Sequence, residues 1–154
     1  MYSYLIQFLA LFLLMLVTGI FWGPWFSLHR SIKVFNIHEF IHIVNTMAAN
    51  LAVPMRILMP GCILLMLLSV WTYPQGNSLG FYVSLLAFVL TVVSLLVTLI
   101  VEVPIINQIT QWTGSAYPSD WETIRNRWVK FHVVRTFSSI LSFGCFAASI
   151  LFLQ

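Results

Sequence analysis

Four long apolar stretches divide this chain and restrict its fold more than any other feature. They cover residues 5–26, 54–73, 79–101 and 133–153. Each is about 20 residues long, which as helix is enough to cross a ~30 Å hydrocarbon layer. Inside a bilayer every backbone amide needs a partner within the protein, and only helices and closed barrels provide one. Because the stretches show no period-two alternation, the sequence predicts an all-α integral membrane four-helix bundle forming a single domain over residues 1–154.

The composition excludes an ordinary soluble domain. Hydrophobic residues make up 60% of the chain and charged residues only 7%, whereas soluble domains carry about 25% charged residues. The net charge of +3 does not indicate nucleic-acid binding, because the seven basic residues lie beside apolar spans and form no basic stripe. We therefore expect the partners to be membrane lipids and a lipophilic small molecule, with no nucleic acid.

Other signals agree with a membrane bundle. The first apolar stretch has no basic n-region and no small-residue cleavage site, so we interpret it as a retained span. Cys62 and Cys145 both lie in apolar stretches and are predicted to be buried free thiols.

The connections between the stretches differ in length and charge. Residues 74–78 form a short uncharged turn, which predicts an antiparallel hairpin of the second and third spans. Every Lys and Arg lies in the first or third connection or just inside the adjoining end of an apolar stretch, as Arg56 and Arg135 do. None lies in the termini or in the short turn. By the positive-inside rule, both charged connections face the cytoplasm and both termini lie on the non-cytoplasmic side, which we assign to a bacterial inner membrane.

Helices are expected to extend beyond the bilayer on that charged side. Ser119 and Glu122 have the spacing of a capping box, which predicts that the fourth helix begins there. The third helix is expected to continue past Glu102, kinked at Pro104, as far as Trp112.

Residues 37–51 have an amphipathic pattern and form either a separate helix or the lower half of the second span. Pro54, which disfavours helical geometry at Val53, leaves both alternatives open.

A polar stripe runs along the predicted fourth helix at alternating spacings of four and three. It comprises Trp121, Arg125, Trp128, His132, Arg135, Ser139 and Ser142. Because a charge facing lipid costs several kcal/mol, Arg135 should point into the bundle or reach the membrane boundary. The alternative is that His132 and Arg135 are anchors at that boundary.

Glu102 ends the third span and follows a second stripe of Thr91, Ser94 and Thr98. A carboxylate at this depth needs a cation, and Arg135 or Arg56 are the candidates. The pair would either lock two helices together or line a polar pocket open to lipid-soluble molecules.

His38, Glu39 and His42 spell H-E-x-x-H, in which two imidazoles bind zinc and the Glu activates water. No conventional third ligand follows, and a solvated amphipathic face explains the same residues. Zinc or another divalent metal at His38 and His42 is therefore an alternative to a chain without a cofactor.

The order of motifs from residue 103 onward is specific. It runs Pro104-Ile105-Ile106-Asn107-Gln108, Trp112, Pro118-Ser119-Asp120-Trp121, Arg127-Trp128, His132 and Val134-Arg135-Thr136. In this last third the chain resembles the anthrone-oxygenase-like family of small four-span membrane proteins, whose bacterial members are mostly classed as a domain of unknown function. The four-span layout extends the resemblance over the whole chain, but the first half carries no matching motif.

The resemblance implies oxidation of an anthrone-like, flat and lipophilic substrate without a conventional cofactor. The family positions implied to line the site are Asn107, Trp128, His132 and Arg135. A neutral His can take a phenolic or benzylic proton, Arg can hold the resulting charge, and Trp can stack on the ring. We therefore assign His132, Arg135 and Glu102 as candidate catalytic residues, and Asn107, Trp128 and Arg125 as candidate substrate-binding residues.

Two other classes of function remain open at this stage. One is a zinc-dependent membrane hydrolase using the residues at 38–42. The other is a non-catalytic scaffold or lipid-binding subunit whose polar stripes fasten the bundle. An oligomer is compatible with any of the three.

Overall fold

The structure, a computed structural model, describes residues 2–74, 76–113 and 116–153. Five α-helices are connected by two short helical segments. They are α1 (Tyr2–Ser27), the 3-10 segment η1 (His29–Val34), α2 (Ile37–Trp71), α3 (Leu79–Val97), the π-helical segment η2 (Thr98–Glu102), α4 (Val103–Ile109) and α5 (Trp121–Leu151). The described residues contain no β-strand beyond one isolated bridge between Thr113 and Ala116.

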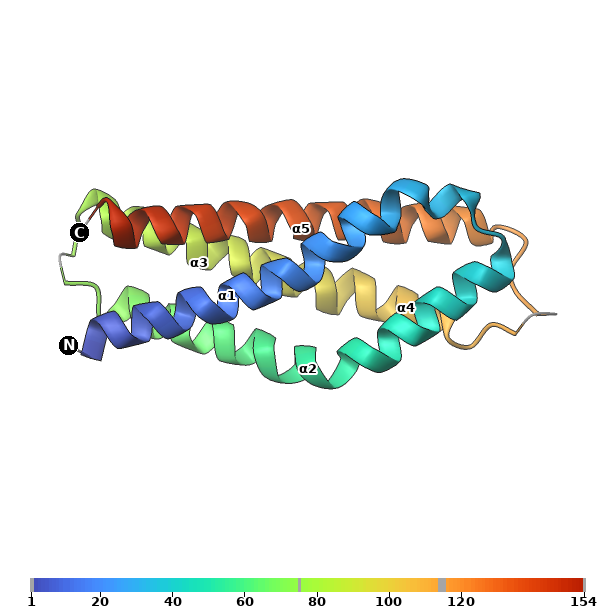
Figure 1. The fold of residues 1–154 in the computed structure, drawn as a ribbon, viewed down its shortest axis with the longest axis horizontal. Coiled ribbons are helices and arrows are strands. Elements are labelled where there is room, and N and C mark those ends of the chain that lie inside the picture. The colour runs from blue at the N-terminus through green and yellow to red at the C-terminus, as the bar shows by residue number, and fades with distance from the viewer. Residues whose placement is uncertain (1, 75, 114–115, 154) are drawn as a thin grey trace.

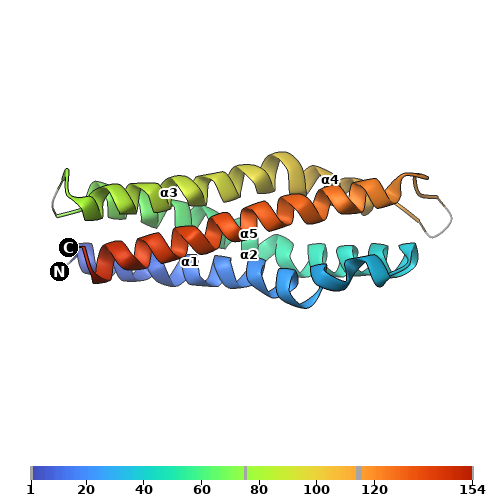
Figure 2. The ribbon, with the colours of Figure 1, turned by 90° about the horizontal axis from the view of Figure 1, so that it is seen from above.

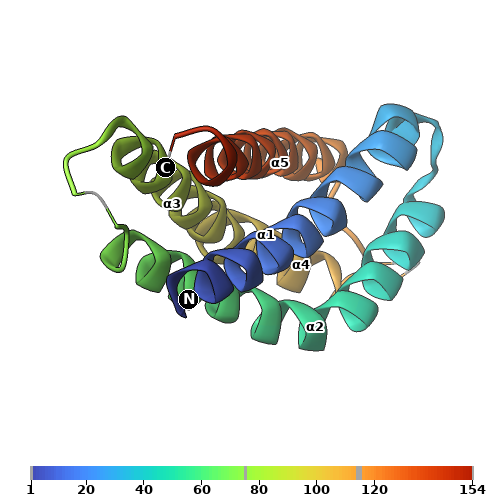
Figure 3. The same cartoon turned by 60° about the vertical axis from the view of Figure 1, so that its left-hand side comes forward.

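The helices form an elongated antiparallel bundle (Figure 1). Both ends of the chain and the α2–α3 turn lie at one end, and the two charged connections lie at the other (Figure 1). α3 packs most extensively against α5, and α1 crosses the bundle from beside α2 to beside α5 (Figure 3). The predicted hairpin of the second and third spans is confirmed, although Gln75 of its turn lies outside the described residues. In the turn Asn77 has a φ of 66°, a left-handed conformation that Asn tolerates better than most residues.

The bundle exposes many large apolar side chains and buries several polar ones. Four helical stretches are long and apolar enough to cross a membrane: Tyr2–Val34, Ile37–Trp71, Leu79–Ile109 and Trp121–Leu151. In their most apolar windows only 17–28% of the residues are buried, and large side chains such as Ile57 are more than half exposed. Because such a surface is stable only against lipid, the fold is that of an integral membrane protein.

Small hydroxyl-bearing residues hold α3 against α5. Thr91 and Ser142 share a 2.7 Å hydrogen bond between their side-chain oxygens, and Ser142 also donates to the carbonyl of Ala87 at 2.7 Å. Ser94 donates to the carbonyl of Arg135 at 3.1 Å. In lipid the hydrophobic effect does not drive helices together, so close packing of small residues and hydrogen bonds must do so.

Gly80 allows the tightest approach between α3 and its neighbours. A Cβ atom there would collide with the hydroxyl of Tyr73 and the carbonyl oxygen of Leu153. We predict that Gly80→Ala lowers the thermal unfolding midpoint in detergent, because the C-terminal end of α5 must move. Gly144→Ala in α5 is the matched control, since a Cβ there meets nothing within 4 Å and Ala favours helix. Equal midpoints for the two variants would contradict this packing.

The second helix is one continuous element from Ile37 to Trp71, so the amphipathic residues 37–51 are its lower half. Pro54 and Pro60 both lie inside it. Its start is fixed by a capping box that the sequence analysis missed: Asn36 accepts from the amide of Glu39 at 3.0 Å, and Glu39 accepts from the amide of Asn36 at 2.9 Å.

The capping box predicted at Ser119 and Glu122 is wrong. The N-cap of α5 is Asp120, and it makes no side-chain capping hydrogen bond. The third helical position is then Thr123, which has no carboxylate to complete a box, while Glu122 approaches Arg125 at 3.8 Å.

The third predicted helix consists of α3, η2 and α4. Its geometry changes just before Pro104, where a kink was predicted, and it ends at Ile109 rather than at Trp112. Pro104 has no amide hydrogen, and its ring would collide with the carbonyl of Ile100 in a regular α-helix. The wider π turn over Thr98–Glu102 removes that conflict, and the chain arches there (Figure 2). The connection that follows is described as far as Thr113 and again from Ala116 onward.

Candidate functional site

Five buried side chains meet where α1, η1, η2 and α5 come together. They are His29, Glu102, Trp128, His132 and Arg135, and we call them the polar cluster. Four are at most 6% exposed, and the side chain of Arg135 is 11% exposed. The stripe predicted on the fourth helix therefore faces the bundle, and Arg135 is not a lipid-boundary anchor.

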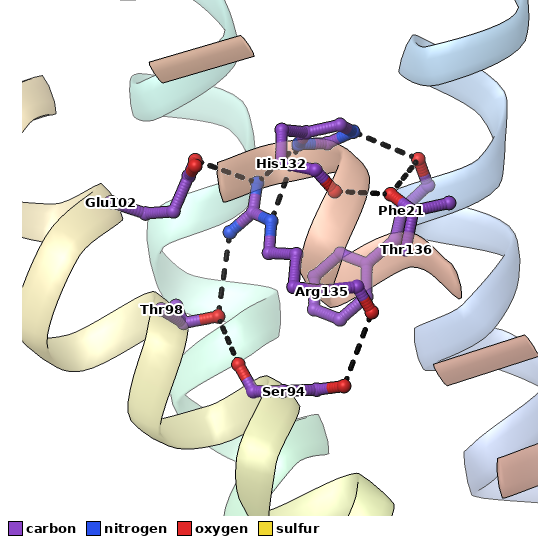
Figure 4. A network of polar contacts seen from close by, with 7 residues as sticks. All are labelled: Phe21, Ser94, Thr98, Glu102, His132, Arg135 and Thr136. Atoms are coloured by element: carbon purple, nitrogen blue, oxygen red, sulfur yellow. Dashed lines mark hydrogen bonds and ion pairs between the residues drawn. The ribbon is translucent and has the colours of Figure 1, made fainter. Parts of the chain in front are cut away.

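Arg135 is the centre of this cluster (Figure 4). Its Nη2 lies 3.2 Å from Glu102 Oε2, and its Nε and Nη2 lie 3.2 and 2.7 Å from His132 Nδ1. Its Nη1 donates to the Thr98 hydroxyl at 3.4 Å, and the guanidinium carbon lies 4.6 Å from the centroid of the Phe21 ring. The guanidinium group is thus held by four neighbours, which come from two other helical segments, α1 and η2, and from its own helix.

The contacts of His132 define its tautomer. Because Nδ1 accepts from Arg135, the ring hydrogen belongs on Nε2, which donates to the carbonyl oxygen of Phe21 at 3.0 Å. Thr136 also donates to that carbonyl, at 3.4 Å. The imidazole is therefore neutral and fixed between α1 and Arg135, with both ring nitrogens in use.

The π turn places Glu102 in the interior. Glu102 is the last residue of η2 and is fully buried, while Leu99 and Ile100 in the same turn face outward. Of the two cations predicted as its partner, the structure selects Arg135, because Arg56 is exposed on α2. Among the described residues, neither Glu102 carboxylate oxygen nor Trp128 Nε1 forms a well-aligned hydrogen bond, so the contact of Glu102 with Arg135 is an ion pair.

His29 is a member of the cluster that the sequence analysis missed. Its ring centroid lies 4.1 Å from that of His132 and 4.6 Å from that of Trp128, both edge-on. Neither of its ring nitrogens has a hydrogen-bond partner among the described residues, although the residue is only 6% exposed. No periodicity marks it, because it begins a short 3-10 segment after α1.

Of the three candidate substrate-binding residues, one belongs to the polar cluster, one lies next to it and one lies outside it. Trp128 belongs to the cluster, and Arg125 is buried one turn before it with its guanidinium carbon 4.8 Å from the Trp121 ring centroid. Asn107 lies on the exposed face of α4, outside the cluster. Its carbonyl accepts a hydrogen bond from the Thr110 hydroxyl at 3.0 Å.

The H-E-x-x-H residues lie on the first turns of α2. His38 and His42 are exposed, and Glu39 is engaged in the capping box. Within residues 2–74, 76–113 and 116–153, no group of three or more His, Cys, Asp or Glu side chains could hold a metal ion. A helix cap thus accounts for Glu39 of this motif.

The fold and the cluster together define a class: a four-helix membrane protein with a buried Arg–Glu–His network. A family model described as anthrone oxygenase matches residues 47–145, more than half of the chain, and the chain belongs to this family. The match begins well before residue 103 and includes Glu102, Trp128, His132 and Arg135, whereas Phe21 and His29 precede it. Comparisons with curated proteins and with solved structures found no match.

The Glu102–Arg135 pair is predicted to be essential for stability. Removing one member leaves a buried charge without its partner, so Glu102→Gln and Arg135→Met should each lower the free energy of unfolding by about 3–5 kcal/mol. The double variant should lose less than the sum of the two, because no unpaired charge remains. Unfolding by denaturant in detergent measures all three.

Arg127→Met is the matched control for that cycle. Arg127 is exposed on the same helix, and its loss should change the free energy of unfolding by about 0.5 kcal/mol or less. Additive effects of the two cluster substitutions would contradict the pairing.

Proposed function

We propose that this protein is a membrane oxidoreductase of anthrone-oxygenase type that oxidises a lipophilic phenol or quinone-like substrate with O₂. The observation that carries the proposal is the polar cluster itself. It combines a cation, two imidazole rings and a tryptophan inside an apolar bundle. Family membership supports the reaction class.

The groups of the cluster fit proton removal from an activated carbon. For an anthrone, the CH₂ group loses a proton to an imidazole, and the electron pair moves into the ring system as an enolate. Arg135 stabilises the negative oxygen, and Trp128 packs against the flat substrate. The enolate then reduces O₂, so that anthrone and O₂ give anthraquinone and H₂O.

Two imidazoles are candidates for the base. His132 holds Arg135 through Nδ1, so accepting a proton there requires Arg135 to shift toward the substrate oxygen. In residues 2–74, 76–113 and 116–153, His29 finds no hydrogen-bond partner for either ring nitrogen, so it can accept a proton without breaking such a bond. Glu102 keeps the guanidinium in place from the other side.

We place this site at the cytoplasmic boundary of a bacterial inner membrane, with both termini on the opposite side. The argument is the positive-inside rule, because the Lys and Arg residues gather toward the end away from the termini. The 31 residues of α5 rise about 46 Å, so its charged N-terminal part extends beyond a ~30 Å hydrocarbon layer.

The proposal predicts that purified protein in lipid nanodiscs consumes O₂ and forms quinone when an anthrone is added. General acid–base catalysis contributes about 10²–10⁴-fold, so His132→Ala and His29→Ala should each lower kcat by at least about 100-fold. An oxygen electrode and the quinone absorbance measure turnover, and circular dichroism checks the fold.

The control is the double variant His38→Ala/His42→Ala, which should turn over at the wild-type rate because both side chains are exposed and outside the cluster. Full activity in folded His132→Ala and His29→Ala would sink the proposed roles. No turnover by the wild-type protein with any anthrone or related phenol would favour a scaffold. Stoichiometric zinc lost in the control variant would favour the hydrolase.

A further inference from the structure

A cationic groove lies between η1 and the N-terminal part of α5, which run beside each other at the charged end of the bundle (Figure 1). Its volume is about 290 Å³. The lining residues are His29, Arg30, Ile32, Lys33, Asn126, Val129 and Lys130. Three of these side chains are cations, and none is a carboxylate.

The three cations, Arg30, Lys33 and Lys130, have no carboxylate partner among the residues that the structure describes. The ion pairs in that part of the chain join Arg125 to Glu122 and Arg135 to Glu102. Arg30 instead lies 5.7 Å from the centroid of the Phe26 ring. The groove therefore concentrates positive charge that the protein itself does not neutralise, and this favours an anionic ligand.

His29 gives an independent indication of a ligand. It lines the groove, is 94% buried, and has no hydrogen-bond partner on either ring nitrogen within the part of the chain that the structure describes. A buried polar atom without a partner is costly, so such atoms in a groove indicate that a ligand or solvent completes them. The Asn126 amide adds a further donor on the opposite wall.

The position of the groove relative to the apolar spans indicates which kind of anion it binds. Lys130 stands three residues before the apolar segment that begins at Val133, and η1 directly follows α1. On the membrane side lie the exposed rings of Phe26 and Phe137, and Trp25 contacts Phe137 edge-on at 5.3 Å. Charged donors at the boundary with exposed apolar rings next to them match a phosphate group attached to acyl chains.

We propose that this groove binds the phosphate group of an anionic phospholipid. Arg30, Lys33 and Lys130 neutralise the phosphate, and His29 donates to it from the base of the groove. The acyl chains lie along the apolar surface near Phe26 and Phe137. The groove shares His29 with the proposed oxidation site. Lipid binding is measured without turnover, so failure of this proposal is distinguishable from failure of the proposed function.

The test compares lipid binding by detergent-purified full-length variants. The probes are phosphatidylglycerol, phosphatidylcholine and inorganic phosphate, each titrated at 0.15 M salt, roughly the physiological ionic strength at which distant surface charges are screened. Native mass spectrometry gives the lipid affinities, and thermal unfolding gives the stabilisation by each probe. The wild-type protein should prefer phosphatidylglycerol to the other two.

The critical variant is Lys33→Ala/Lys130→Ala. Each basic residue near an anionic lipid contributes roughly five-fold in affinity, so the double variant should bind phosphatidylglycerol about 25-fold more weakly. Arg56→Ala/Arg127→Ala removes the same charge from exposed positions outside the groove and should leave the affinity within about two-fold. His29→Ala should weaken binding without changing the number of permanent cations.

Three results would overturn the proposal. An equal loss of affinity in both double variants would show that net charge alone attracts the lipid. Equal stabilisation by inorganic phosphate and by phosphatidylglycerol would show that the groove serves a soluble anion and not a lipid. Retained phosphatidylglycerol affinity in Lys33→Ala/Lys130→Ala, with the protein still folded, would also exclude this groove as the site.

Discussion

The ion pair between Arg135 and Glu102 is the constraint on which the rest of this bundle depends. A single charge buried among apolar helices is costly, and each of these residues is tolerable only because the other lies 3.2 Å away. The pair requires η2 and α5 to keep a fixed register. It also requires α1 to approach closely enough for the Phe21 carbonyl to accept from His132. The π turn before Pro104 and the hydrogen bond from His132 to α1 both serve this requirement.

Packing elsewhere in the bundle also pairs buried polar groups with one another. Outside the cluster, α3 and α5 are joined by Ser and Thr hydroxyl groups that bond across the interface, and many bulky aliphatic residues are exposed on the outer surface. This inverts the arrangement of a soluble bundle, because lipid tails are as apolar as Leu and give helices no reason to bury it. A rigid framework of this kind can keep a cation and two imidazoles in place without water, which is the condition for the proposed chemistry.

Much of this could be predicted from the sequence, and the exceptions have physical reasons. Hydropathy was sufficient for the spans, and the four-three spacing on α5 for a single polar stripe. The sequence left the partner of Glu102 open between Arg135 and Arg56, because the distance between helices is set by the tertiary fold. His29 was missed because periodicity carries no information in a 3-10 segment whose position depends on the tertiary fold. Asn107 was assigned by resemblance alone, and the π turn before Pro104 leaves it on an exposed face. The Ser119 box failed because Asp120 took the capping position.

The most direct test is a solid-state NMR distance between the Arg135 guanidinium nitrogens and the Glu102 carboxyl carbon, measured in lipid bilayers on protein labelled at Arg and Glu. The Arg135→Lys variant identifies the signal by its loss. A strong dipolar coupling, consistent with the 3.2 Å contact between Nη2 and Oε2, is the predicted result. A spectrum in which wild type and variant show the same couplings would mean that the two charges do not meet, and the buried cluster would have to be abandoned.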